Sequence, residues 1–163
     1  MSSDKKPASP APLGATVTDS GVAFGVYSET AEKIWVCLFD DQDEETDRVE
    51  MSRGEANRWS VHIDGLTANA SYGLRADGKY DPARGYYFDP NKLLVDPYAR
   101  RIDRTFVRSP KLRLARDESV DTAPVVPKAL VQGPVLEPDW APDTTRPNLI
   151  YELNVRPFTM RHP

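Results

Sequence analysis

Residues 33–39, Lys-Ile-Trp-Val-Cys-Leu-Phe, form a segment in which every residue after the lysine is apolar. Successive side chains of a β-strand point to opposite sides, so as a strand this segment presents two apolar faces. The first face carries Ile34, Val36 and Leu38, and the second carries Trp35, Cys37 and Phe39. A strand of this kind is covered on both sides. One cover is the facing sheet of a β-sandwich, and the other is either a loop of this chain or another domain.

The neighbouring segments favour strands that are apolar on one face. In residues 21–27, 58–64 and 71–76, apolar side chains recur with a period of two, as in half-buried strands. The side chains expected to point inward are Val22, Phe24, Val26, Trp59, Val61, Ile63, Tyr72 and Leu74. Because Trp59 and Tyr72 are in phase with this set, core packing is favoured over a role in binding. Short strands separated by turns predict an all-β fold, an immunoglobulin-like antiparallel β-sandwich.

The overall composition argues against several classes of function. The net charge is −4 and the isoelectric point is near 5.2, which disfavours nucleic acid as a partner because phosphates require basic patches. One cysteine, Cys37, and two histidines, His62 and His162, predict no intramolecular disulfide and no metal site, and nothing indicates a cofactor. No stretch approaches the ~20 apolar residues that span a membrane, and the first residues lack the apolar core of a signal peptide. We therefore expect a cytoplasmic protein without membrane contact.

Residues 40–45, Asp-Asp-Gln-Asp-Glu-Glu, are a run of acidic side chains after the doubly apolar segment. A calcium-binding loop of the EF-hand type needs a central glycine and a terminal glutamate at fixed spacing, which this run lacks. A solvated turn is therefore favoured over a metal site.

Residues 78–98 have a different character, because three Asp-Pro steps divide them at 81–82, 89–90 and 96–97. Proline fixes its own φ angle and restricts the residue before it, so these steps set turns and exclude a regular strand or helix. Aromatic side chains alternate with these turns at Tyr80, Tyr86, Tyr87, Phe88 and Tyr98. Such a segment needs a surface on which its aromatic side chains can pack.

The two ends of the chain differ from the middle. Residues 1–12 are polar and proline-rich and are expected to be a disordered tail. Residues 109–147 contain seven of the 15 prolines and are expected to form a long connector with one strand at 129–131. Residues 148–155, Asn-Leu-Ile-Tyr-Glu-Leu-Asn-Val, have the pattern of a buried strand. A connector of this length indicates that it leads to a further domain, so we expect the chain to be cut off there.

Two motifs make the chain similar to a known family. Tyr80-Asp-Pro-Ala-Arg-Gly85 and Phe88-Asp-Pro-Asn-Lys-Leu-Leu-Val-Asp-Pro-Tyr-Ala99 resemble the signature of bacterial glycogen-debranching enzymes and isoamylases. Residues 121–128 resemble the connector of that family, and residues 150–159 resemble the first barrel strand of its glycoside hydrolase family 13 members. The resemblance extends over residues 12–163.

The resemblance implies an architecture. Residues 13–108 would be the sandwich of the family-48 carbohydrate-binding modules, an early-set immunoglobulin-like fold that includes the Asp-Pro segment 78–99. The long Pro-rich carboxyl-terminal extension would then comprise the connector 109–147 and, at 148–163, the first strand of a (β/α)8 catalytic barrel. The motif residues expected at the seam between sandwich and barrel are Tyr80, Asp81, Pro82, Arg84, Gly85, Asn91, Lys92, Asp96, Pro97, Tyr98, Tyr151 and Glu152.

The chain departs from the family pattern at three positions. The family usually has His and Gly where this sequence has Asn154 and Pro157, and Asn where it has Asp89. Pro157, just beyond the strand motif, would stiffen the first βα loop.

The resemblance implies a non-catalytic module of an α-1,6-glucan hydrolase. Retaining hydrolysis of a glycosidic bond requires two carboxylates about 5–5.5 Å apart, and in a (β/α)8 barrel these lie at the ends of several strands. No acid of residues 1–163 aligns with the family's nucleophile or its acid/base. Glu152 lies inside the strand motif, where it is expected to order the barrel. The sequence therefore predicts no catalytic residue and a chain that is inactive alone.

Weak binding of α-glucan (glycogen) remains an open alternative. Sugar rings stack on exposed aromatic side chains, and the candidates for such a platform are Trp35 and Tyr27. For Trp35, contact with the Tyr80–Tyr98 segment or with a barrel is favoured over a sugar platform. The main hypothesis is thus a module that packs against a catalytic barrel, and the alternative is a stand-alone α-glucan-binding module. An unrelated adhesion domain of immunoglobulin type is disfavoured by the single cysteine.

The apolar surface has a further consequence. Residues 149–155 combine high β-propensity with an unpaired edge, and large exposed apolar patches favour association. We therefore expect the isolated chain to self-associate or to have a disordered carboxyl-terminal third.

Overall fold

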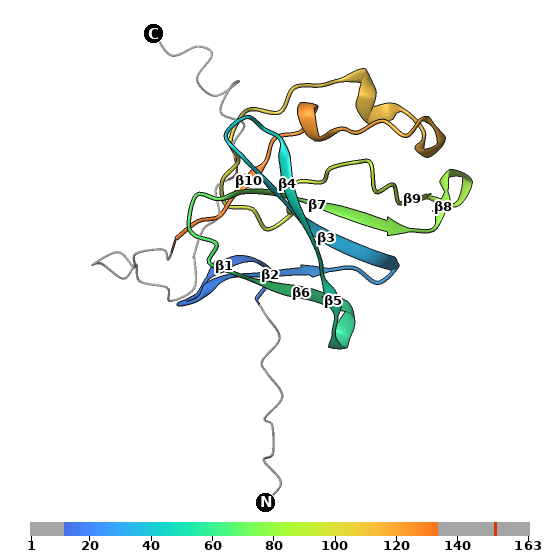
Figure 1. Cartoon of the computed structure of the whole chain (residues 1–163). Helices are drawn as coiled ribbons and strands as arrows, with labels where there is room; N and C mark the ends of the chain where they lie inside the picture. The colour runs from blue at the N-terminus through green and yellow to red at the C-terminus, as the bar shows by residue number, and fades with distance from the viewer. Residues whose placement is uncertain (1–11, 134–151, 153–163) are drawn as a thin grey trace, which may run out of the picture.

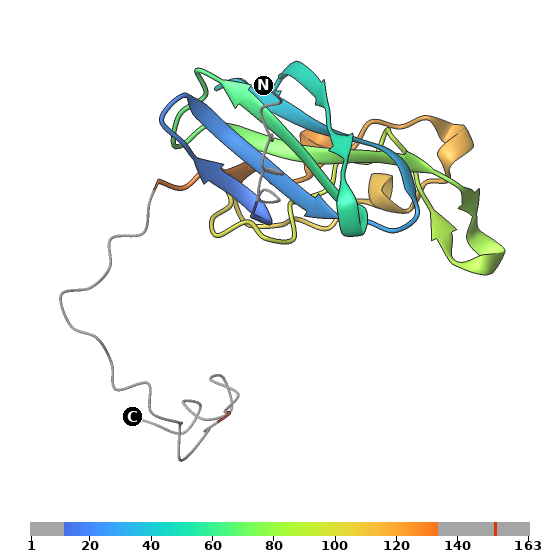
Figure 2. The ribbon, with the colours of Figure 1, turned by 90° about the horizontal axis from the view of Figure 1, so that it is seen from below.

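The computed structural model describes residues 12–133 and residue 152, and residues 12–133 form an all-β fold (Figure 1). Two four-stranded antiparallel sheets face each other (Figure 2). The first sheet has the order β1 (Gly14–Val17), β2 (Gly21–Tyr27), β6 (Arg58–Asp64) and β5 (Ser52–Arg53). The second has the order β10 (Ala129–Leu130), β7 (Ser71–Gly78), β3 (Ala31–Phe39) and β4 (Glu45–Glu50). The predicted antiparallel sandwich is confirmed.

Short elements connect and extend the two sheets. A small hairpin joins β8 (Tyr80–Asp81) to β9 (Tyr86–Tyr87) and extends from one end of the sandwich (Figure 2). The described helical turns are all of the 3-10 type: η1 (Glu55–Asn57), η2 (Pro82–Arg84), η3 (Pro110–Arg113), η4 (Arg116–Glu118) and η5 (Ala123–Val125). Among the described residues, no helix is long and apolar enough to cross a membrane.

The main core lies between the two sheets and contains the side chains that the period-two pattern predicted. Val22 and Phe24 of β2 face Val36 of β3, and all three are buried. Trp59 and Tyr72, for which core packing was favoured, are 4% and 1% exposed. The rings of Phe24 and Tyr72 meet edge to face with their centroids 4.9 Å apart. Every second side chain along the strands of both sheets thus contributes to one apolar layer between the sheets.

The second face of β3 is covered by this chain itself, which resolves the alternative left open by the sequence. Cys37 and Phe39 lie in a second apolar cluster with Leu93, Ala123 and Val126. Trp35 packs against the same cluster, which includes Leu93 of the Asp-Pro segment. Burial raises the pKa of the Cys37 thiol to about 12. We call residues 88–128 the covering segment.

The covering segment leads into the last strand of the second sheet. β10 at Ala129–Leu130 pairs with β7 and confirms the strand expected near residue 129. Residues 109–133, the described part of the expected connector, therefore contribute to the packing of the sandwich. The tail at 1–11 and most of the expected barrel strand at 148–163 lie outside the described residues.

The Asp-Pro segment is more regular at its start than expected. Instead of wholly irregular chain, it contains the paired strands β8 and β9, in which Tyr80 lies opposite Tyr87 and Asp81 opposite Tyr86. The first Asp-Pro step is the reason, because Pro82 begins the turn η2 and Gly85 ends it at a φ of 82°, a left-handed angle that favours glycine. The Gly85 amide donates to the Pro82 carbonyl over 3.1 Å and closes the hairpin.

Candidate functional site

The second and third Asp-Pro steps form two similar turns. One carboxylate oxygen of Asp89 accepts a hydrogen bond from the Asn91 amide over 2.9 Å, and one of Asp96 accepts from the Tyr98 amide over 2.8 Å. Each side chain thus stabilises the turn at the proline that follows it. The two aspartates are buried, at 6% and 4% exposure.

The two aspartates differ at their second oxygen. Asp96 Oδ2 accepts a hydrogen bond of 2.7 Å from the Tyr72 hydroxyl, which ties the third turn to the main core. Burial and this hydrogen bond raise the pKa of Tyr72. Asp89 Oδ2 is buried and has no hydrogen-bond partner within the described part of the chain.

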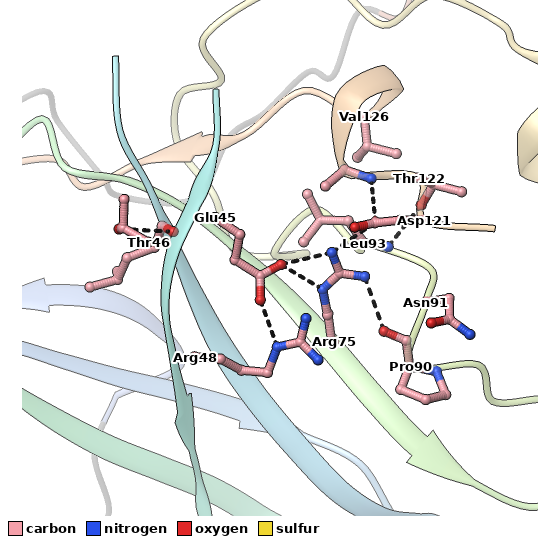
Figure 3. A network of polar contacts seen from close by, with 12 residues as sticks. Glu45, Thr46, Arg48, Arg75, Pro90, Asn91, Leu93, Asp121, Thr122 and Val126 are labelled. Atoms are coloured by element: carbon pink, nitrogen blue, oxygen red, sulfur yellow. Dashed lines mark hydrogen bonds and ion pairs between the residues drawn. The ribbon is translucent and has the colours of Figure 1, made fainter. Parts of the chain in front are cut away.

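The covering segment is held on the second sheet by three groups of polar contacts, which we call clasps. The first centres on Arg75 of β7, which is 1% exposed (Figure 3). Its guanidinium donates to Glu45 over 2.7 Å, to Asp121 over 2.8 Å and to the Pro90 carbonyl over 3.0 Å. Burial opposes the ionisation of Glu45, but hydrogen bonds from Arg48 and Arg75 outweigh it and lower the pKa of that carboxyl.

The second clasp centres on Lys128, whose side chain is fully buried. Its Nζ lies 2.6 Å from Asp43 and 4.6 Å from the centre of the Phe39 ring, and it donates to two backbone carbonyls, those of Ala123 and Val126. Asp43 also accepts from Arg104 over 2.7 Å. The acidic run is therefore not simply a solvated turn, because Asp43 and Glu45 each bind buried cations.

The third clasp centres on Arg116 in the turn η4. Its guanidinium donates to Asp77 over 2.9 Å and to the carbonyls of Gly78 and Phe88 over 3.1 Å each. Its amide donates to the Tyr80 hydroxyl over 3.3 Å. This clasp joins the covering segment to the end of β7 and to the β8–β9 hairpin.

Three adjoining hollows lie along the Asp-Pro segment. The first, of about 350 Å³, lies between Tyr27, Phe88 and Leu94, and the second, of about 410 Å³, shares the last two of these residues and reaches Asp89. The third, of about 550 Å³, lies between the hairpin and the turns η3 and η4. The second and third hollows share Tyr87, Asp89 and Lys92.

Comparison with known proteins places this arrangement in a family. Residues 12–99 match carbohydrate-binding module 48, described as the isoamylase N-terminal domain. The chain belongs to this family. Residues 12–99 are therefore a carbohydrate-binding module of family 48.

Individual relatives of this family-48 module agree with the assignment. The glycogen debranching enzyme of Yersinia enterocolitica is 36% identical over 163 residues, which cover 95% of this chain and 24% of the relative. The glycogen debranching enzyme of Serratia proteamaculans is 35% identical over 160 residues, with 94% and 24% covered. The chain thus spans about a quarter of the length of these curated relatives.

A solved structure supports the fold of the family-48 module. The catalytic module of the multi-modular glycogen-degrading pneumococcal virulence factor SpuA, solved in complex with an inhibitor, has a TM-score of 0.52 to this chain at 21% identity. The similarity covers 76% of this chain and 17% of that one, and it shows the fold alone.

The two aromatic candidates for a sugar platform have different surroundings in the family-48 module. Trp35 is half-buried and packs against the second apolar cluster, to which Leu93 belongs. Tyr27 is 47% exposed, lines the first hollow and donates a hydrogen bond from its hydroxyl to Glu29. That hydrogen bond raises the pKa of Tyr27. Tyr27 is therefore the more exposed residue of this pair.

The motif residues of the hairpin are mostly at the surface. Tyr80 is 36% exposed, Pro82 and Arg84 are exposed, and Asp81 lies near Lys79 and Arg84 at 3.6 and 3.7 Å. Their arrangement follows from the turn that Gly85 closes.

The motif residues after the hairpin connect it to the covering segment. The Asn91 carbonyl accepts from the Thr122 amide over 3.1 Å, and Lys92 donates from Nζ to the Lys111 carbonyl over 3.0 Å. Pro97 is exposed, as is Glu152, whereas Tyr151 lies outside the described residues.

Exposed apolar side chains recur along the chain in residues 94–107. They are Leu94, Tyr98, Ile102, Phe106 and Val107, which are 47%, 46%, 41%, 54% and 70% exposed. We call these five residues the seam strip. Among the described residues, the other large apolar side chains at the surface are Tyr27, Tyr80 and Tyr87. Of the five residues, sequence reasoning singled out only Tyr98, because apolar residues in an irregular segment carry no period. Their recurrence within a short stretch was the available signal.

Proposed function

We propose that this chain is the amino-terminal, non-catalytic module of a glycogen-debranching α-1,6-glucan hydrolase and that it packs against the catalytic barrel. The names of the relatives support the enzyme class, since glycogen debranching enzymes match over nearly the whole chain. In this proposal the module forms a rigid neighbour of the barrel and contributes no reacting group.

The seam strip is the observation that carries the proposal. Its five side chains are exposed, yet the segment that bears them is held on the sandwich at several points. The Leu94 and Leu74 backbones exchange two hydrogen bonds of 2.8 Å, Asp96 accepts from Tyr72, and Arg104 of the second clasp donates to Asp43. Protein interfaces combine apolar contact area with a backbone that changes little on binding. A clasped segment with apolar side chains directed to solvent meets both conditions.

The acidic side chains of the clasps have the wrong electrostatics for glycoside hydrolysis. A general acid needs a raised pKa, as in the retaining mechanism that family resemblance implies. Burial opposes the ionisation of Asp43, Glu45 and Asp121, but hydrogen bonds from neighbouring groups outweigh it and lower the pKa of all three. These carboxylates therefore remain ionised partners of buried cations.

The test is reconstitution with a detached barrel. The 163-residue chain is mixed with the Yersinia enterocolitica debranching enzyme from which its own module has been removed, and complex formation is followed by sedimentation velocity. We expect a one-to-one complex that Phe106→Ser with Val107→Ser abolishes. Tyr27→Ser, at an aromatic position outside the strip that is 47% exposed, is the control and should leave the complex intact. If the wild-type chain sediments at the same rate with and without the barrel, the proposal is contradicted.

A second candidate function is supported by Tyr27. Its half-exposed ring beside the first hollow has the geometry of a sugar platform, so a stand-alone module that binds α-glucan weakly is the alternative. Co-sedimentation with glycogen checks it: retention that Tyr27→Ala removes favours this function. Trp35→Ala is the contrasting variant, because Trp35 packs in the second cluster and its loss should lower stability rather than binding alone.

A further inference from the structure

We infer that the hollow beside the turn η3 is a binding site for a small anion that carries a phosphate group. The hollow has a volume of about 430 Å³ and is lined by Arg108, Ser109, Pro110 and Arg113. It shares only Arg113 with the three hollows along the Asp-Pro segment. Such a ligand requires neither a barrel nor a glucan, so the inference goes beyond the proposed function.

The first argument is the distribution of charge along the chain. Residues 100–116 contain seven of the 21 Lys and Arg residues but only one of the 25 Asp and Glu residues. This stretch is therefore strongly basic, although the net charge of the chain is −4. A surface that gathers charge of one sign attracts ligands of the opposite sign.

The second argument is that the cations at the hollow lack acidic partners. In the clasps, Arg104, Arg116 and Lys128 each form an ion pair with an aspartate. Arg108 and Arg113 are exposed, and neither forms an ion pair with the described residues. The two other residues that line the hollow are uncharged. An anion between the two guanidinium groups would supply the missing negative charge.

The third argument is the turn that brings these groups together. The Lys111 amide donates to the Ser109 hydroxyl oxygen over 3.3 Å and helps to fix the turn, while Arg108 and Arg113 meet at one hollow. The Ser109 hydroxyl keeps its own proton for a ligand. Lys92 donates from Nζ to the Lys111 carbonyl over 3.0 Å, which adds a positive charge beside the turn.

The chemistry of these groups favours phosphate over a carboxylate. A guanidinium group presents a planar fork of N–H donors that matches two oxygens of a phosphate group. A phosphate monoester has three acceptor oxygens and a charge of about −1.5 to −2 at pH 7. It can therefore accept from Arg108, Arg113 and Ser109 at once, whereas a carboxylate has a single charge and fewer oxygens.

The test is an amide NMR titration of the full 163-residue chain with inorganic phosphate at constant ionic strength. We expect saturable shifts at millimolar phosphate, largest at residues 108–113. Arg108→Gln with Arg113→Gln removes both guanidinium groups and should weaken binding about tenfold or more. Both side chains are exposed, so the variant should keep the far-UV circular dichroism of the wild type. Arg101→Gln is the matched control, at an exposed arginine of the same stretch that does not line the hollow, and should leave binding unchanged.

Three results would overturn the inference. The first is that chloride at the same ionic strength causes shifts as large as those of phosphate. The second is that Arg101→Gln weakens binding as much as the double variant does, which would mean that the whole basic stretch attracts anions without a site. The third is tighter binding of a glutamate-rich peptide than of phosphate, which would assign the arginines to an acidic protein partner. No barrel takes part in this titration, so its outcome does not depend on the docking proposal.

Discussion

The two faces of the second sheet are covered in different ways. The inner face packs on the first sheet through a cluster of apolar side chains, among them Val36 of β3 and Leu74 of β7. The outer face is covered by a segment without regular strands, which holds its place with the buried cations Arg75 and Lys128 as well as with apolar contacts. The inner layer thus depends on burial of apolar area, whereas the outer layer also depends on the pairing of buried charges. We expect the outer layer to be lost first when conditions weaken charge pairing.

The largest effect is expected from the inner layer. Phe24→Ala removes a ring that is 1% exposed and packs on Tyr72, so the free energy of unfolding should fall by about 3–5 kcal/mol. Urea denaturation followed by far-UV circular dichroism measures it, and unfolding should remain one cooperative transition. A loss below about 1 kcal/mol would show that the two sheets do not form the main core.

A somewhat smaller effect is expected from the second clasp. Lys128→Ala leaves Asp43 and the Ala123 carbonyl without this buried donor, and the free energy of unfolding should fall by about 3 kcal/mol. Hydrogen exchange should accelerate in residues 104–126 more than in β2 and β6. Equal acceleration in all three would contradict the division into two layers. Lys33→Ala, which removes an exposed lysine of β3, is the control for both measurements.

The sequence could predict the inner layer but not the outer one. The period-two pattern found the inward residues of β2, β3, β6 and β7, because alternation repeats along a regular strand. The covering segment has no period, so neither its path nor its contacts follow from local sequence. Arg75 and Lys128 are charged residues that are ordinarily exposed, and their partners Asp121 and Asp43 are distant in the chain. One signal was available: Arg75 lies opposite Trp35, on the face that the doubly apolar pattern requires to be covered.

The candidate functional residues were likewise predictable from the sequence only in part. The Asp-Pro motifs were recognised from residue order, and each Asp-Pro step does set a turn. The free oxygen of Asp89 could not be foreseen, because it depends on which donors the folded chain brings near it.

Close contact between β7 and the covering segment gives a third prediction. A Cβ atom at Gly73 would lie 2.7 Å from Leu93 Cδ1, so Gly73→Ala should lower the free energy of unfolding by about 1–3 kcal/mol. Leu93→Ala removes the clash as well as its own packing. The double variant should therefore be more stable than the sum of the two single changes predicts, as measured by urea denaturation. Additive losses would mean that the two residues are not in contact.

The smallest effect on the stability of the fold is expected when the pH is lowered. Burial opposes the ionisation of Asp43, Glu45 and Asp121, but their hydrogen bonds with cations and amides outweigh it and hold each pKa low. A carboxyl whose folded pKa is depressed stabilises the fold above its unfolded pKa of about 4, and this contribution is lost as pH falls through the folded value. Below about pH 4, hydrogen exchange should rise in the covering segment before it rises in β2 and β6. Simultaneous loss of both layers would contradict this order.

The most direct test of the proposed docking is hydrogen exchange of the 163-residue chain with and without the detached barrel. The account predicts that amides of residues 94–107, which carry the seam strip, become protected when the barrel is added, while those of residues 21–27 in the first sheet do not change. Unchanged exchange of residues 94–107 at saturating barrel would contradict it.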